Sequence, residues 1–140
     1  MIRVRHILLL TVVMLLPLSV AYSSDLGTAD ETITAFFKKL ETGAIEDGYK
    51  TLFEGSLISK EKPQAIQAMV TQTSAAFAIY GKILGWERVE EKVFGQSLKK
   101  ITYLMNTKYP VAWEFYFWKS EGRWSVVNVR FVEQVQEVFY

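Results

Sequence analysis

The hydrophobic period of this chain changes at Gly81, and this change constrains the fold more than any other feature. Before Gly81, apolar residues recur at the spacing of one helix face, as at Ile33, Phe36, Phe37 and Leu40. After Gly81, apolar and β-branched residues alternate with a period of two, which is typical of strands. Helices followed by hairpin-linked strands favour an α+β fold, with helices packed on an antiparallel sheet.

Three helices are predicted before Gly81. Thr28 and Glu31 have the spacing of a capping box, which marks a helix N-terminus. Pro63 suits the first turn of a later helix. The predicted segments are a helix from about Thr28 to Gly43, a helix at about Ala44–Phe53, a loop at Glu54–Lys62 and a helix from Pro63 to about Tyr80.

Four strands are predicted after Gly81, because four segments are rich in β-branched and aromatic residues. Glu121-Gly122 is a tight-turn signal that joins the last two strands. The predicted strands are Leu84–Val93, Leu98–Thr107, Val111–Lys119 and Arg123–Val138.

The last hairpin predicts which side chains share a face of the sheet. If Ser120 pairs with Arg123, one face carries the pairs Trp113–Arg130, Phe115–Asn128 and Phe117–Val126. The other face then carries Glu114–Val129, Tyr116–Val127 and Trp118–Ser125. Both faces are rich in apolar groups, so we expect helices to cover one face and a partner subunit or a ligand to cover the other.

Residues 1–23 have the features of a secretory signal peptide. Arg3 and Arg5 form a basic start, an apolar run follows, and small residues near Ala21 suit a cleavage site. The apolar run, about 14 residues broken by Pro17, is shorter than the roughly 20 residues of a membrane span, so cleavage is preferred over an anchor. We therefore expect one domain at 24–140, located in a bacterial periplasm or the extracellular medium.

The composition of that domain excludes several kinds of chemistry. The chain has no cysteine, and its single histidine, His6, lies in the predicted signal peptide. No zinc site, disulfide framework or histidine base is therefore expected, and no cofactor or metal is predicted. Of the 16 Lys and Arg residues, all but Arg3 and Arg5 lie in the domain, where 14 remain against 15 Asp and Glu. This balance argues against binding to nucleic acid or, after cleavage, to a membrane.

Glu114 is the most unusual candidate residue, because a carboxylate is rare in the middle of an aromatic strand. One interpretation is a proton carrier whose pKa is raised in a dry cavity. The alternative is a carboxylate that faces solvent or pairs with Lys100 or another cation.

Five further residues are candidates for ligand binding. Arg130 and Asn128 lie among valines of the last strand, where they could orient a ligand in an apolar pocket. The alternative is that Arg130 stacks on Trp113 and Asn128 satisfies backbone groups. Tyrosines could hydrogen-bond a ligand, although such residues are more often part of the core. The candidate ligand-binding residues are Arg130, Asn128, Trp113, Tyr103, Tyr49 and Glu114, with Gln72 and Thr73 as weaker candidates on the inner side of the third helix.

Three stretches of the chain are similar to small exported members of the nuclear transport factor 2-like superfamily. They are Tyr80–Glu87, Trp113–Lys119 and Gly122–Asn128. The resemblance implies a cystatin-like α+β cone of three helices and a strongly curved four-stranded sheet. This superfamily includes ketosteroid isomerase, dehydratases and cyclases, and many non-catalytic binding and dimerisation domains. The His–Asp pattern of the dehydratases is missing from residues 24–140.

Three hypotheses about function follow. The first is an exported non-catalytic domain that binds a small apolar or amphipathic ligand, or a protein partner, in its cone or on its sheet. The second is a structural module that forms a homodimer through exposed aromatic residues of the sheet. The third is an isomerase or lyase that uses Glu114 with Tyr103 or Tyr49, and it requires a buried Glu114 with a raised pKa.

Overall fold

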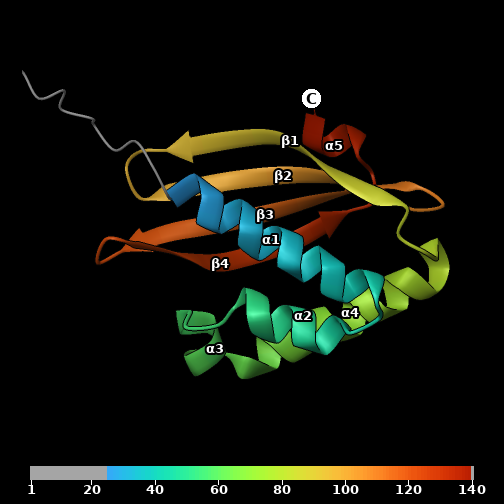
Figure 1. The fold of residues 1–140 in the computed structure, drawn as a ribbon, viewed down its shortest axis with the longest axis horizontal. Coiled ribbons are helices and arrows are strands. Elements are labelled where there is room, and N and C mark those ends of the chain that lie inside the picture. The colour runs from blue at the N-terminus through green and yellow to red at the C-terminus, as the bar shows by residue number, and fades with distance from the viewer. Residues whose placement is uncertain (1–24, 140) are drawn as a thin grey trace, which may run out of the picture.

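The computed structural model describes residues 25–139, with side chains from Ala29 onward, and the predicted signal peptide lies outside the described residues. The fold is α+β, with an open four-stranded antiparallel sheet, as predicted (Figure 1). The helices are α1 (Asp25–Glu41), α2 (Ile45–Leu52), α3 (Leu57–Glu61), α4 (Pro63–Tyr80) and α5 (Gln136–Phe139), and the strands are β1 (Gly85–Phe94), β2 (Leu98–Asn106), β3 (Pro110–Ser120) and β4 (Arg123–Val132).

Two segments differ from the prediction. The loop expected at Glu54–Lys62 contains α3, because the Ser56 side chain caps the helix by accepting a hydrogen bond from the Ser59 amide at 3.3 Å. In the described part of the chain, four helices therefore precede the sheet instead of three. The last strand ends at Val132 and not at Val138, and Gln136–Phe139 form the short helix α5.

The sheet is a meander in which each strand pairs with the next, in the order β1-β2-β3-β4. Glu121 and Gly122 have φ angles of 51° and 76°, the left-handed conformation that a two-residue hairpin turn requires. The predicted tight turn is therefore confirmed, and so is the pairing of Ser120 with Arg123 and of Phe117 with Val126.

A β-bulge at Val127 changes the register beyond that point. Val127 is an extra residue of β4, since Phe117 pairs with Val126 and Tyr116 with Asn128. The partners predicted for the rest of β3 are therefore wrong by one residue. The observed pairs are Phe115–Val129, Glu114–Arg130 and Trp113–Phe131. The bulge thus places the Glu114 carboxylate opposite the Arg130 guanidinium.

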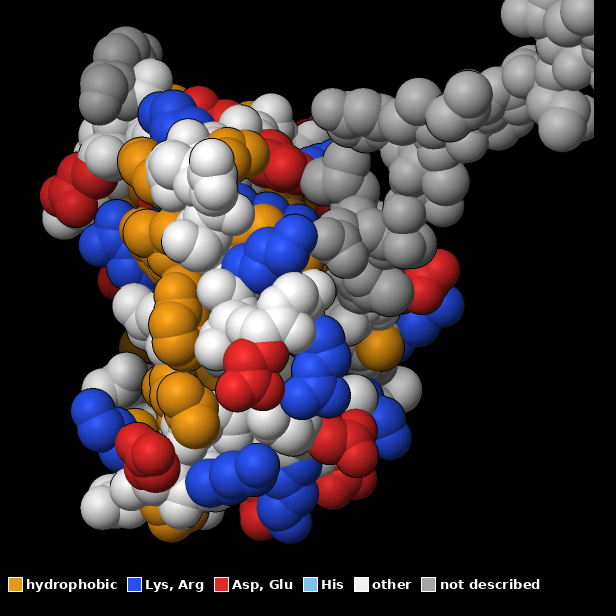
Figure 2. Space-filling model, turned by 90° about the vertical axis from the view of Figure 1, so that its left-hand side faces the viewer, with side chains coloured by type: hydrophobic (Ala, Val, Ile, Leu, Met, Phe, Trp, Pro, Cys, Tyr) orange, Lys and Arg blue, Asp and Glu red, His pale blue; other side chains and the backbone are white. Residues whose placement is uncertain are grey.

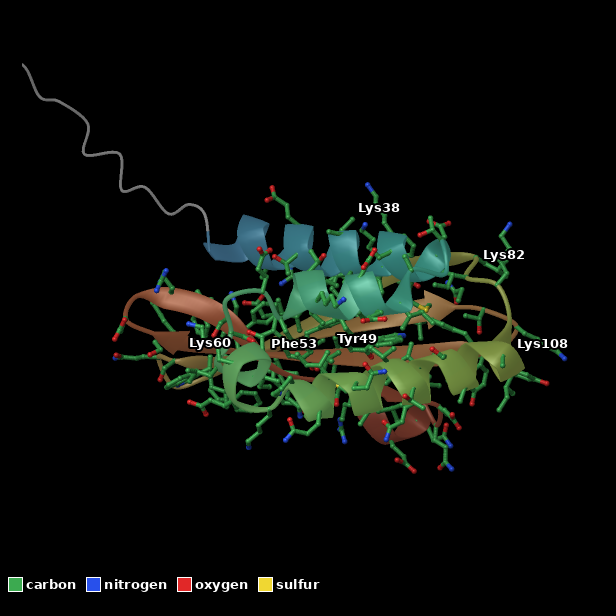
Figure 3. The ribbon with its side chains drawn as sticks, turned by 90° about the horizontal axis from the view of Figure 1, so that it is seen from below. Lys38, Tyr49, Phe53, Lys60, Lys82 and Lys108 are labelled. Carbon is green, nitrogen blue, oxygen red and sulfur yellow. The ribbon has the colours of Figure 1, made fainter. Side chains whose placement is uncertain are left out.

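The helices and the sheet enclose an aromatic core. Helix α1 lies across one face of the sheet, whereas α5 lies on the opposite side (Figures 1 and 3). The rings of Phe36 and Phe37 on α1 meet Trp113 and Phe115 on β3 at centroid distances of 5.5 to 5.8 Å. We call the side of the sheet that meets α1 the helix face, and the opposite side, which carries Lys100, Thr102, Glu114 and Arg130, the far face.

Candidate functional site

A groove lies where α2 and α4 approach the outer strand β4. It has a volume of about 290 Å³ and is lined by Tyr49, Met69, Gln72, Val129, Arg130 and Phe131. We call it the β4 groove. Its lining combines apolar side chains with the polar residues Gln72 and Arg130, the mixture that is typical of sites for small amphipathic molecules. The volume is near the lower end of the range for ligand pockets, about 300 Å³.

Tyr49 forms the inner wall of the β4 groove. The Tyr49 hydroxyl and the Thr73 hydroxyl share a buried hydrogen bond of 2.7 Å, which joins α2 to α4. Burial raises the pKa of Tyr49 to about 12, and the bond to Thr73 lowers it less, so the phenol stays protonated at neutral pH. Figure 3 shows Tyr49 and Phe53 inside the molecule, whereas the labelled lysines point outward. Because its hydroxyl is bonded to Thr73, Tyr49 is expected to contact a ligand in the groove mainly through its ring.

Glu114 is the centre of an ionic cluster on the far face. The Lys100 ammonium donates to Glu114 Oε1 at 2.9 Å, and the Arg130 Nε donates to Glu114 Oε2. The Tyr116 hydroxyl also donates to Oε2, at 3.3 Å. Only 2% of Glu114 is exposed, whereas 57% of the Arg130 side chain is exposed. We call these four residues the Glu114 cluster.

The Glu114 cluster stabilises the charged form of its carboxylate. Burial alone raises the pKa of Glu114, but the hydrogen bonds from Arg130 and Lys100 outweigh burial, and the pKa is lowered overall. The alternative interpretation from the sequence, a carboxylate paired with Lys100 or another cation, therefore describes Glu114 correctly.

The structure does not assemble the residues that the isomerase or lyase hypothesis needs. Tyr103 pairs with Trp113 in the sheet and its side chain contacts Phe37, so it lies on the helix face, while Glu114 lies on the far face. Tyr49 is also on the helix side, in contact with Phe36. The pKa of Glu114 is lowered, which is opposite to the requirement of that hypothesis. These three residues form no proton-transfer site.

The other predicted ligand-binding residues lie outside the β4 groove. Trp113 is only 1% exposed and belongs to the core, where its indole N–H has no hydrogen-bond partner among the described residues. The Tyr103 hydroxyl donates to Asp30 at 2.6 Å. Asn128 is exposed on the far face opposite Tyr116. Of the six predicted residues, the groove therefore contains Tyr49 and Arg130, and Glu114 is joined to it only through Arg130.

Sequence reasoning found one further groove residue and missed three. Gln72 lines the groove, as its place on the inner side of the third predicted helix suggested. The three that it missed are Met69, Val129 and Phe131, none of which was a candidate for ligand binding. The β-bulge at Val127 changes the strand pairing, so that Val129 and Phe131 lie on the helix face. No pattern in the sequence indicated this bulge.

Two more hollows lie along the first half of β4. One, of about 370 Å³, lies between α3 and the β3–β4 hairpin and includes Leu57, Lys60, Trp118 and Trp124 in its lining. The other, of about 230 Å³, lies between α2 and the start of β4 and includes Leu52, Phe117 and Val126. Concave surface therefore follows much of the length of β4.

Residues 25–139 contain no cluster of three or more acidic or metal-ligating side chains that could hold a metal ion. None of the helices described there has the length and apolar character needed to cross a membrane.

Comparison of the chain with protein-family models and with curated proteins gives no match.

Proposed function

We propose that this protein is a non-catalytic binding domain that holds a small amphipathic ligand in the β4 groove. The observation that carries this proposal is the convergence of three apolar side chains, Met69, Val129 and Phe131, with the amide of Gln72 around one hollow, which Arg130 also borders. Such a lining favours a molecule with a short apolar part and an acidic or hydrogen-bond-accepting group.

The packing of the core favours a ligand-binding site at the edge of the sheet over one at the centre of the domain. Phe36, Phe37, Trp113 and Phe115 are fully buried and in mutual ring contact, so they fill the space between α1 and the sheet. A ligand in the middle of the domain would have to displace these rings, at a cost of several kcal/mol for each large side chain that leaves the core. The β4 groove needs no such displacement.

We further propose that the domain is exported, on the basis of the signal-peptide features of residues 1–23. We also propose that the fold is nuclear transport factor 2-like. The support is the order of its elements, with helices preceding a four-stranded meander and α1 packed across one face of the sheet. In this fold, a site at the rim of the helix face would lie at the mouth of the cone.

Native mass spectrometry of the protein purified from its own host tests the proposed function. The wild-type chain is expected to carry an additional small-molecule mass. Met69→Trp is expected to lose most of that mass, because the larger indole fills the groove. Ile79→Trp is the matched control, since Ile79 is 69% exposed on the same helix and does not line the groove. Equal loss from both variants, or no bound mass in wild type, would contradict the proposal.

A second candidate function is a homodimer formed through the far face. Phe94, Leu98 and Trp118 are adjacent in register across β1, β2 and β3, and Phe94 and Trp118 are 48% and 38% exposed. Figure 2 shows hydrophobic side chains in a band down the face of the molecule that includes the hairpin end of the sheet. An exposed apolar row of this kind is typical of an interaction surface.

Trp118→Lys tests the homodimer directly. A lysine in the middle of a dry interface leaves a charge without solvent, so a dimer through this row is expected to dissociate into monomers. Light scattering after size-exclusion chromatography measures the mass. Ile79→Lys, at an exposed apolar residue of α4, is the matched control and is expected to leave the mass unchanged. An unchanged mass for Trp118→Lys would exclude this interface.

A further inference from the structure

The end of the molecule where α4 leads into β1 exposes large apolar side chains. Leu84 is 72% exposed and Ile79 is 69% exposed, the two highest values for large hydrophobic residues in the described part of the chain. Tyr109, in the turn between β2 and β3, is 52% exposed. Exposed apolar side chains mark an interaction surface where they lie together.

The α4–β1 loop and the β2–β3 turn lie side by side. The Lys108 amide donates a hydrogen bond to the Tyr80 carbonyl at 3.2 Å, and the Leu84 amide donates to the Asn106 carbonyl at 2.8 Å. The rings of Tyr80 and Tyr109 are in edge-on contact, with their centroids 6.2 Å apart. Leu84 and Tyr109 therefore belong to one tip of the molecule.

Buried residues hold both segments in place. Ile83 is 5% exposed and belongs to the core, although its neighbours Lys82 and Leu84 are exposed. Thr107 is 7% exposed, and its hydroxyl donates to the Tyr109 carbonyl at 2.7 Å. The exposed side chains are thus carried by anchored backbone. A surface that is ordered before binding loses less conformational entropy when it binds.

Two lysines accompany the exposed apolar side chains. Figure 3 shows Lys82 and Lys108 at this end of the molecule, pointing outward, and Lys60 at the opposite end. The Lys108 ammonium lies 5.7 Å from the centroid of the Tyr109 ring. Among the described residues, neither Lys82 nor Lys108 forms an ion pair. We call Lys82, Leu84, Lys108 and Tyr109 the basic tip.

The charge at the basic tip differs from the charge of the whole domain. Glu133 brings one carboxylate to this end, where its hydrogen bond with Tyr80 raises the pKa of that tyrosine. The two lysines of the tip outnumber this carboxylate. The near-neutral charge of residues 24–140 predicted no membrane binding. At physiological salt, however, attraction to a charged surface falls off within about 8 Å, so the charges nearest that surface decide it.

We propose that the basic tip docks the domain on an anionic lipid bilayer, with Leu84 among the acyl chains and Lys82 and Lys108 beside the lipid phosphates. Leucine supplies the hydrophobic part of such binding, because its side chain leaves water. Tyrosine suits the headgroup level, where its ring and its hydroxyl are both satisfied. Lysine adds attraction to anionic lipids. This inference goes beyond the proposed function and does not depend on it.

A fluorescent probe attached at the basic tip tests this proposal. The chain has no cysteine, so Leu84→Cys in the full chain gives one attachment site for a nitrobenzoxadiazole probe, which brightens in an apolar environment. We expect the emission to rise with vesicles that contain phosphatidylglycerol and not with vesicles of phosphatidylcholine alone. Leu57→Cys, at a 50% exposed leucine of α3, is the matched control and should give no response.

Two further variants in the labelled Leu84→Cys chain test the electrostatic part. Lys82→Gln is expected to raise the lipid concentration at half-maximal response about fivefold, which corresponds to the attraction of one lysine to an anionic surface. Lys60→Gln, at the opposite end of the molecule, is the matched control and should leave that concentration unchanged (Figure 3).

Three results would overturn membrane docking by the basic tip. One is an equal response of the probes at Leu84 and Leu57, because contact would then not be specific to the tip. Another is an equal response to both kinds of vesicle. The third is an unchanged signal at Leu84, which would leave a protein as the partner of this end. None of these results bears on the β4 groove, whose ligand is measured as a bound mass.

Discussion

Replacement of Trp113 by alanine is expected to lower the free energy of unfolding by about 3–5 kcal/mol. Trp113 is 1% exposed, and its ring contacts Phe36, Phe37, Phe115 and Phe131. Alanine would leave a cavity at the point where α1, β3 and β4 meet. Since a domain of this size is stable by only about 5–15 kcal/mol, the loss removes a large part of the total.

Urea denaturation followed by far-ultraviolet circular dichroism measures this effect. Trp118→Ala is the matched control, because Trp118 is on the same strand but 38% exposed on the far face. We expect that control to lose about 1 kcal/mol or less. Similar losses for the two variants would show that the core is not centred on Trp113.

Replacement of Glu114 by alanine is expected to lower the free energy of unfolding by about 3 kcal/mol. The substitution leaves the ammonium of Lys100, whose side chain is mostly buried, without its nearest carboxylate. Removal of one member of a buried charge pair is far more harmful than loss of a surface pair, and Lys100 would keep only the longer contact with Glu90, at 3.9 Å. Glu87→Ala, at an exposed acid of β1, is the matched control and should change stability by about 0.5 kcal/mol or less.

The contribution of Glu114 should also depend on pH. Its pKa is lowered in the folded chain, because the hydrogen bonds from Arg130 and Lys100 outweigh the effect of burial. The stabilisation is therefore complete above the unfolded pKa of about 4.3 and is lost as the pH falls through the folded value. The stability difference between wild type and Glu114→Gln should be constant from pH 6 to 8 and should shrink below about pH 4. A difference that grows on acidification would contradict the ion-pair assignment.

The fold class and most of its elements could be predicted from local patterns. The stripe of apolar residues on α1 and the alternation in the strands depend on residues close in sequence, and each fixes which side of an element is buried. The short helix α3 was missed because its five residues have no apolar stripe, and only the cap at Ser56 marks it. The end of β4 was missed because alternation continues in the sequence to Val138 after the chain has left the sheet.

The site was harder to predict because it depends on which residues of β3 and β4 pair, and one extra residue in β4 changes those pairs. The bulge at Val127 moves Arg130 from the expected position opposite Trp113 to the position opposite Glu114. A shift of one residue exchanges the two faces of a strand, so it changes the neighbours of every later side chain. Tyr103 and Trp113 were predicted to bind a ligand, but both are buried in the core between α1 and the sheet. Their burial depends on how α1 packs, which no pattern within β2 or β3 indicates.

The proposed function places the ligand in the β4 groove. The most direct test is a map of amide chemical-shift changes in the labelled protein during titration with decanoate, which has a carboxylate and a short apolar chain. We expect saturable shifts centred on the groove residues Met69, Gln72, Val129 and Phe131. Shifts confined to Phe94 and Trp118 on the far face, or no saturable shifts, would contradict it.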